Sequence, residues 1–134
     1  LIRQIMKVHS HSATCATSFA QWGAVTALEG PQDSIAAMVA AWDRRRRLVT
    51  EWLNAVPGFH CPLPEGAFYV FPDVSGTGLS GDEVATRLIE QAHVAVTPGS
   101  AFGTSGSNCI RLSVATADAL LEEALKRIAR VFGG

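Results

Sequence analysis

Lysine is scarce in this sequence, and net charge of either sign is nearly absent. The 134 residues contain two lysines, Lys7 and Lys126, and the formal net charge is −1 at pH 7. A chain with so little net charge creates no strong field that would attract nucleic acid or an anionic membrane surface. We therefore expect neither kind of partner.

Long apolar runs and cysteine pairs are lacking as well. No stretch approaches the roughly 20 apolar residues that a membrane span needs. The first ten residues carry Arg3 and Lys7 without a long apolar core or a cleavage site, so they do not resemble a signal peptide. The three cysteines, Cys15, Cys61 and Cys109, are scattered and odd in number. Buried thiols in a cytoplasmic protein are the simplest interpretation.

The remaining composition is typical of one globular domain. Hydrophobic residues make up 48% of the chain and charged residues 17%. A domain of this length buries about 65–70% of the surface that its unfolded chain exposes.

Apolar periodicity and turn residues divide the chain into predicted elements. Residues 1–8 are expected to form a short helix or strand, and residues 9–16 a polar loop. Helical spacing predicts helices at 17–29, 33–56, 80–92 and 116–132, the third begun by a capping box at Ser80 and the last capped by Thr116. Alternation predicts a hairpin of 59–63 and 67–71 around a turn at 64–66, and further strands at 94–97 and 109–114. This order predicts an α/β fold, a two-layer sandwich with helices on one face of a small mixed or antiparallel sheet.

One strand carries the most informative residue, Arg111. In Ile110-Arg111-Leu112-Ser113-Val114 the apolar and polar residues alternate, so one face is buried and the other displays the arginine. An arginine in a short strand has a fixed height and direction, and its planar fork suits a carboxylate better than lysine does. From this strand alone, a surface ion pair and a ligand-carboxylate site both remain open.

Three other patterns look like binding sites but have simpler structural explanations. Residues 76–81 match G-x-G-x-x-G, yet four residues separate them from the preceding strand, so a loop with a helix cap is favoured over a dinucleotide site. The arginines at 44–47 point all around a helix, which favours a solvated, partly salt-bridged stretch over a phosphate patch. His9, His11 and Cys15 share one loop without a fourth ligand, so no metal site is expected.

Three separated segments carry a family resemblance. They are 64–72 (PEGAFYVFP), 96–103 (VTPGSAFG) and 108–116 (NCIRLSVAT). In this order and spacing they resemble the C-terminal part of fold-type-I, pyridoxal-phosphate-dependent aminotransferases of the aspartate aminotransferase class. The resemblance extends over essentially the whole chain, including 17–21 (TSFAQ).

The resemblance implies substrate-binding residues in this chain but no catalytic residue. In that family the arginine at the position of Arg111 binds the substrate α-carboxylate. The aromatic residue at the position of Phe68 lies near the substrate, and a glycine at Gly66 allows close backbone approach. Core packing of the predicted hairpin is the competing interpretation of Phe68. Ser100 and Phe102 are expected to shape the rim of the site.

The resemblance also implies a reaction, a cofactor and an assembly. The reaction is amino-group transfer between an amino acid, with aspartate favoured, and a 2-oxo acid, in a homodimer that uses pyridoxal 5'-phosphate. The family holds this cofactor as a Schiff base on a lysine. Neither Lys7 nor Lys126 has the sequence context of that lysine, so the chain is expected to be a piece of a longer enzyme, to bind no cofactor covalently and to be inactive alone. Residues 9–16 replace the Asn-Pro often found in this loop, which leaves the substrate preference more open.

The resemblance finally implies a domain boundary. Residues 31–134 correspond to the small, C-terminal domain, and residues 1–30 to the large-domain side or the interdomain connection. A stand-alone ligand-binding or interaction domain without catalysis is the alternative, and only the absence of a suitable lysine supports it.

Overall fold

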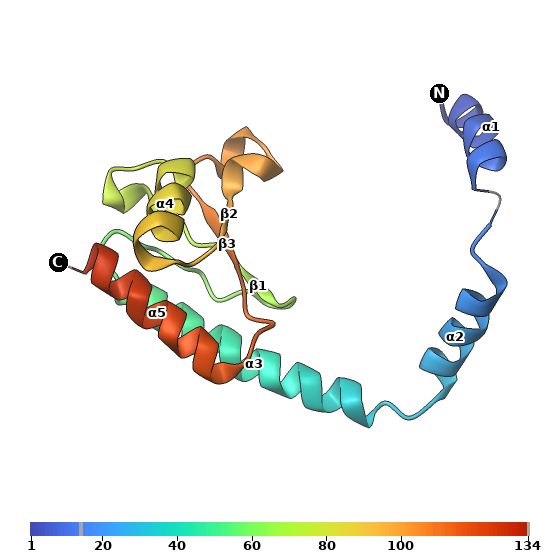
Figure 1. Cartoon of the computed structure of the whole chain (residues 1–134), viewed down its shortest axis with the longest axis horizontal. Helices are drawn as coiled ribbons and strands as arrows, with labels where there is room; N and C mark the ends of the chain where they lie inside the picture. Colours follow the sequence, from blue (N-terminus) through green and yellow to red (C-terminus); the bar gives the residue numbers. More distant parts are fainter. Residues whose placement is uncertain (14, 134) are drawn as a thin grey trace. The chain divides into compact units, whose positions relative to one another are not determined.

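The computed structural model describes residues 1–13 and 15–133 of the chain, which divides into two compact units (Figure 1). The first unit is Leu1–Ala37 and the second is Met38–Gly134. Within the described residues, no helix has the length and apolar character that crossing a bilayer requires.

The first unit contains two helices and the beginning of a third. Helix α1 spans Ile2–Ser12 and helix α2 spans Ser18–Glu29, while α3 starts at Asp33 and continues to Asn54 in the second unit. The prediction for 17–29 is confirmed. The prediction of a loop from residue 9 onward is wrong for residues 9–12, because α1 continues through them. The Ser12 hydroxyl donates to the Val8 carbonyl at 2.7 Å, which is compatible with a continuing helix.

The apolar side chains of the first unit are exposed. Helices α1 and α2 have no buried residue. Even the large apolar side chains of Phe19, Trp22 and Leu28 are 79%, 73% and 82% exposed, respectively. A helix in water normally hides its large apolar side chains against another element. The large apolar side chains of this unit are therefore not covered by any described element.

The second unit is built around a three-stranded antiparallel sheet. The strands β1 (Tyr69–Val70), β2 (Thr97–Pro98) and β3 (Ile110–Ser113) lie in the order β1-β3-β2, so β3 is central. Val70 pairs with Leu112 on one side, and Thr97 pairs with Arg111 on the other.

Helices supply the second layer. They are the C-terminal part of α3, α4 (Gly81–Arg87) with its π-helical continuation Leu88–Ala92, and α5 (Asp118–Phe132). Figure 1 shows α5 running along α3. The buried core takes side chains from both layers: Val49, Leu53, Val84, Leu88, Ile110, Leu112, Val114, Leu121, Leu125 and Ile128. The predicted two-layer α/β class with a small antiparallel sheet is confirmed.

The predicted hairpin of 59–63 with 67–71 is wrong in its register and extent, because the first segment pairs with the returning chain only through one antiparallel bridge between His60 and Asp73. The strand at 67–71 is reduced to β1, which pairs with β3 instead. The Asn54 side chain donates to the Cys61 carbonyl at 2.9 Å and accepts from the Cys61 amide at 2.8 Å, so the segment is bonded to the end of α3. Pro62 and Pro64 also lack the N–H that a ladder needs. The predicted strand at 94–97 is likewise reduced to β2, and the Val94 amide donates to the Leu88 carbonyl.

The capping box predicted at Ser80 is confirmed. The Ser80 hydroxyl accepts from the Glu83 amide at 3.3 Å, and the Glu83 carboxylate accepts from the Ser80 amide at 2.8 Å. The bonds that the Glu83 carboxylate accepts from the Ser80 amide and hydroxyl lower the pKa of Glu83. The glycine-rich segment before α4 is thus a loop with a helix cap. The cap predicted at Thr116 is wrong, because Ala117 precedes α5 and no side chain caps it.

The cysteines differ in exposure. Cys61 is buried, and this burial raises the pKa of its thiol. Cys109 is half-buried, whereas Cys15 is exposed. The prediction of buried thiols is therefore confirmed for Cys61, met only in part by Cys109, and wrong for Cys15, which lies in the first unit.

The four consecutive arginines at 44–47 form ion pairs with two aspartates. Arg44 and Arg45 pair with Asp118 at the start of α5, and Arg46 and Arg47 pair with Asp43 one turn earlier in α3. The predicted ion pairs are confirmed, whereas the predicted solvation holds for Arg44 and Arg47 but is wrong for Arg45 and Arg46, whose side chains are largely covered. Asp118 connects the two long helices of the layer, and it also places a negative charge in the first turn of α5.

The Asp118 bridge predicts a pH-dependent stability. The Arg45 and Arg44 guanidinium groups hold the pKa of Asp118 below its ordinary value. Since the folded-state pKa is lowered, the bridge stabilises above the unfolded pKa of about 3.9 and is lost as the pH falls through the folded-state value. We expect Asp118→Asn to lower the unfolding temperature by about 1–4 °C at neutral pH. This difference should shrink as the pH falls below about 4 in thermal melts followed by circular dichroism.

Glu122→Gln is the matched control, since it removes one negative charge from the exposed side of the same helix. It should leave the unfolding temperature nearly unchanged at neutral pH. An Asp118→Asn difference that persists undiminished in acid would contradict the role of the charge.

Candidate functional site

The candidate site lies on the face of the sheet that displays Arg111. Along β3, Ile110 and Leu112 are buried, whereas Arg111 is half-buried and Ser113 is exposed. The two-faced strand predicted from the sequence is thus confirmed. Burial of the apolar face against the helices fixes the direction of the arginine on the other face.

Side chains from three other segments meet the Arg111 guanidinium. Its Cζ lies over the ring of Tyr69 on β1, 4.3 Å from the ring centroid, and over the ring of Phe102, 4.7 Å from the centroid. Phe102 ends the 3-10 turn Gly99–Phe102 that follows β2. On β2 itself, the Thr97 hydroxyl accepts a long hydrogen bond of 3.4 Å from Nη2. Since β3 is the central strand, both of its neighbours contribute to this cluster.

Arg111 differs from most other arginines in its charge environment. The ion pairs found among residues 1–13 and 15–133 involve the arginines at 44–47, Arg127 and Arg130, and none involves Arg111. A half-buried guanidinium that contacts two rings and one hydroxyl keeps most of its five N–H donors for another acceptor. A carboxylate is the acceptor that matches its fork geometry.

Phe68 does not join the aromatic rings over Arg111. Its ring lies 5.0 Å from the Trp42 ring on α3 and 4.4 Å from the Tyr69 ring, and it packs against the core. These contacts are those of the packing role. The predicted place near the substrate stays a prediction.

Gly66 lies in an exposed turn before β1. A Cβ added there would meet nothing within 4 Å, so the close approach predicted at this glycine is not made by the described part of the chain. It stays a prediction about groups outside this chain. The neighbouring Ala67 has a φ of 63°, a left-handed conformation that costs a non-glycine residue about 1–2 kcal/mol.

Tyr69 and Thr97 are site residues that sequence reasoning did not identify, and Phe102 was expected only at the rim. Their positions depend on strand register: Thr97 is the direct partner of Arg111, and Tyr69 pairs with Ser113 on the same face. The mistaken hairpin concealed the pairing of β1 with β3. Alternation around Phe68 was the one available indication, since it places Tyr69 on the opposite face from its neighbours.

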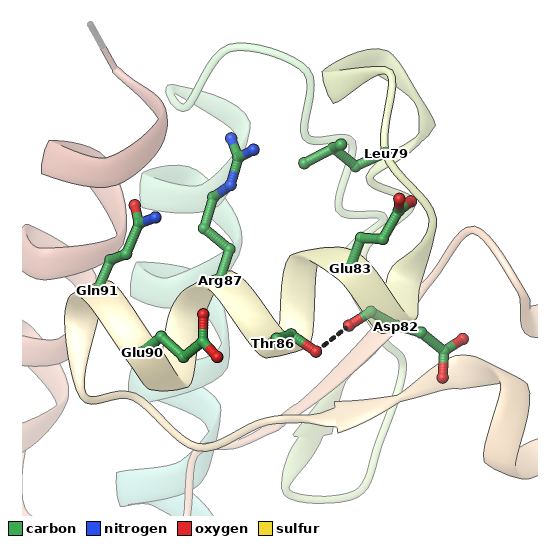
Figure 2. Close-up of a pocket in the computed structure, with 7 residues that line it drawn as sticks. All are labelled: Leu79, Asp82, Glu83, Thr86, Arg87, Glu90 and Gln91. Atoms are coloured by element: carbon green, nitrogen blue, oxygen red, sulfur yellow. Dashed lines mark hydrogen bonds between the residues drawn. The ribbon is translucent and has the colours of Figure 1, made fainter.

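A separate hollow lies along α4 and its continuation, and Figure 2 shows the residues that line it, with the Thr86 hydroxyl bonded to the Asp82 carbonyl. The Asp82 carboxylate accepts from the Ser100 hydroxyl at 3.0 Å, and its backbone carbonyl accepts from the Thr86 hydroxyl. Glu83 belongs to the capping box, and Arg87 lies over the Phe132 ring at 5.7 Å. The hollow is therefore a weaker candidate than the Arg111 face.

The described residues offer no second site at which a cofactor could be covalently attached or a metal ion bound. Lys7 on α1 and Lys126 on α5 are both exposed, so neither amine has the buried surroundings that would favour a stable bond to an aldehyde cofactor. In the part of the chain that the structure describes, His, Cys, Asp and Glu side chains form no group of three suited to a metal ion. The chain's own residues do not fit the covalent attachment of a cofactor.

Comparison with known proteins agrees with the family resemblance carried by residues 64–72, 96–103 and 108–116. The family model described as aminotransferase class I and II matches residues 1–128. The chain belongs to this aminotransferase family. It is 46% identical over 132 residues to a probable aspartate aminotransferase of Methanocaldococcus jannaschii, which covers 98% of this chain and 34% of that protein. It is 44% identical over 139 residues to an aspartate aminotransferase of Rhizobium meliloti, which covers 96% of this chain and 33% of that protein.

The fold of the solved relatives agrees as well. The crystal structure of an aromatic aminotransferase from Pyrococcus horikoshii matches with a TM-score of 0.89 at 40% identity, covering 98% of this chain and 36% of that one. The chain thus spans about a third of the length of the curated relatives that it matches. Two thirds of such a protein have no counterpart in these residues.

The exposed lysines predict that the isolated chain forms no lasting bond with pyridoxal phosphate. After mixing and dialysis, the visible absorbance should return to baseline, because water competes freely at both amines. Borohydride reduction followed by peptide mass mapping is the measurement. A stable yellow species trapped at Lys7 or Lys126 would contradict the expectation, and a Lys7→Arg, Lys126→Arg chain provides the blank.

Proposed function

We propose that this chain is the part of a pyridoxal-phosphate-dependent aminotransferase that binds the substrate α-carboxylate, and that Arg111 is the residue that binds it. The supporting observation is the Arg111 guanidinium, which is held on a sheet face by two rings and has no carboxylate partner among residues 1–13 and 15–133. The surface-ion-pair interpretation needs such a partner.

The physical role of Arg111 is to position the substrate. Two parallel N–H···O bonds from one guanidinium fix both the place and the plane of a carboxylate. A charge-assisted bond of this kind contributes about 1.5–3 kcal/mol, and more when water is excluded. Fixing the carboxylate also fixes the neighbouring Cα–H bond, which lowers the entropic part of the barrier to proton removal.

The proposed reaction moves an amino group between an amino acid and a 2-oxo acid. Pyridoxal phosphate, when bound, supplies an electrophilic aldehyde and an electron sink for this chemistry. Residues outside this chain would hold it, including the lysine that the chain lacks, so the isolated chain should be inactive. Aspartate is the proposed amino acid, because both curated relatives described above are named for it.

The two units have different proposed places in the longer protein. Residues 31–134 would form the small domain, which encloses the substrate. Residues 1–30 would pack against the large domain or lie in the interdomain connection, which accounts for exposed apolar side chains such as Trp22 and Phe19. The longer protein is proposed to be a homodimer. Phe68 and Gly66 are proposed to lie near the substrate in that assembly.

The proposal predicts the effect of Arg111→Lys in the full-length parent. Lysine keeps the charge but cannot form the two-bond fork. We expect kcat/KM to fall by about one to two decades, and by a similar factor for different amino acids because they share the α-carboxylate. Steady-state kinetics with an acidic, an aromatic and a small amino acid measure this.

Arg130→Lys is the matched control, since Arg130 is an exposed arginine of α5 that pairs with Glu123. It should change kcat/KM by less than about twofold. A loss below threefold in Arg111→Lys, with the control unchanged, would return Arg111 to a surface role.

A further inference from the structure

The guanidinium of Arg111 is placed by groups that carry no charge. Two aromatic rings from different segments lie 4.3 and 4.7 Å from Cζ, and a threonine hydroxyl accepts from Nη2. An arginine side chain has several rotatable bonds, and restricting them costs free energy unless contacts compensate. Here the compensating contacts come from the chain itself.

We propose that Tyr69 and Phe102 are positioning residues, which hold Arg111 ready for the carboxylate of the substrate. This inference rests on the proposed function, since it concerns the same arginine. A cation near a ring face is attracted by the ring quadrupole, and arginine makes such contacts readily. Rings over the guanidinium also compete for none of its N–H donors.

Neutral partners suit this task better than a carboxylate would. An acidic neighbour would hold Arg111 equally well, but it would occupy the N–H donors that the substrate needs. The long Thr97 bond, at 3.4 Å, engages Nη2 only weakly. Rings and a hydroxyl therefore restrict the side chain and leave its charge available.

The segment that carries Phe102 is held tightly even though the ring is 53% exposed. The Gly99 amide donates to the Cys109 carbonyl at 2.8 Å, and a Cβ at Gly99 would lie 2.3 Å from the Gly106 carbonyl oxygen. The Ser100 hydroxyl bonds to Asp82 on α4 at 3.0 Å. The turn Gly99–Phe102 is thus packed against the residues that precede β3 and is hydrogen-bonded to α4. The backbone that carries the Phe102 ring is therefore held in place.

Tyr69 is fixed by the sheet. It pairs with Ser113 in the register of β1 and β3, and its ring also contacts the Phe68 ring, which packs on the core. The two rings therefore reach Arg111 from two independently anchored segments. Loss of either ring should leave the arginine present but less restricted.

The test measures carboxylate binding in the full-length parent by calorimetry. The probe is a saturated four-carbon dicarboxylic acid, which has no amino or oxo group and cannot react. Tyr69→Leu and Phe102→Leu should each raise its dissociation constant by about 2- to 30-fold. Tyr69→Phe keeps the ring and should stay within about twofold of the parent.

A matched control and a second background separate positioning from damage to the fold. Phe71→Leu removes an exposed ring that contacts Phe102 edge-on at 6.0 Å, and it should leave the dissociation constant nearly unchanged. In an Arg111→Gln background, Tyr69→Leu should add less than about twofold, because the ring then has no cation to hold.

The outcomes distinguish the two proposals. Unchanged binding in both leucine variants, or equal weakening by Tyr69→Leu with and without Arg111, would overturn the positioning role alone. Unchanged binding in Arg111→Gln itself would overturn the proposed function. Weaker binding of the dicarboxylic acid that depends on Arg111, and that occurs in Tyr69→Leu but not in Tyr69→Phe, supports both proposals.

Discussion

The site depends on one constraint, the burial of the apolar face of β3. Ile110, Leu112 and Val114 are held in the core, so the alternate residue Arg111 must project from the other side of the sheet. A slip of one residue would bury the arginine and expose the apolar side chains, which makes the register strongly specified. Because β3 is central, its two partners bring Tyr69 and Thr97 to the same place.

The sequence predicts the parts of this arrangement that depend on local chemistry. Alternation around Arg111 and the Ser80 capping box were interpretable because each is decided within a few residues. The hairpin at 59–71 failed because Pro62 and Pro64 have no N–H for a ladder, so the pairing is limited to one bridge between His60 and Asp73. The rings over Arg111 were missed because Tyr69 and Phe102 meet it only through long-range strand pairing.

The sequence of the second unit accounts for how its helices and strands pack, whereas that of the first unit does not. The second unit buries a common core, and ion pairs such as Arg45–Asp118 connect its helices. The first unit has regular helices whose large side chains, Trp22 among them, remain exposed. That contrast is what membership in a family of much longer proteins predicts, because the chain spans about a third of its curated relatives. Helical periodicity identifies an apolar helix, but it does not identify the surface that covers the helix, which we propose lies outside this chain.

The most direct test of the central claim is a crystal structure of the full-length parent with an unreactive carboxylic acid bound. The account predicts both carboxylate oxygens at about 2.7–2.9 Å from Arg111 nitrogens in the bidentate geometry, with the Tyr69 and Phe102 rings still over the guanidinium. An Arg111 that instead pairs with a carboxylate of the rest of the protein, while the ligand binds elsewhere, would contradict it.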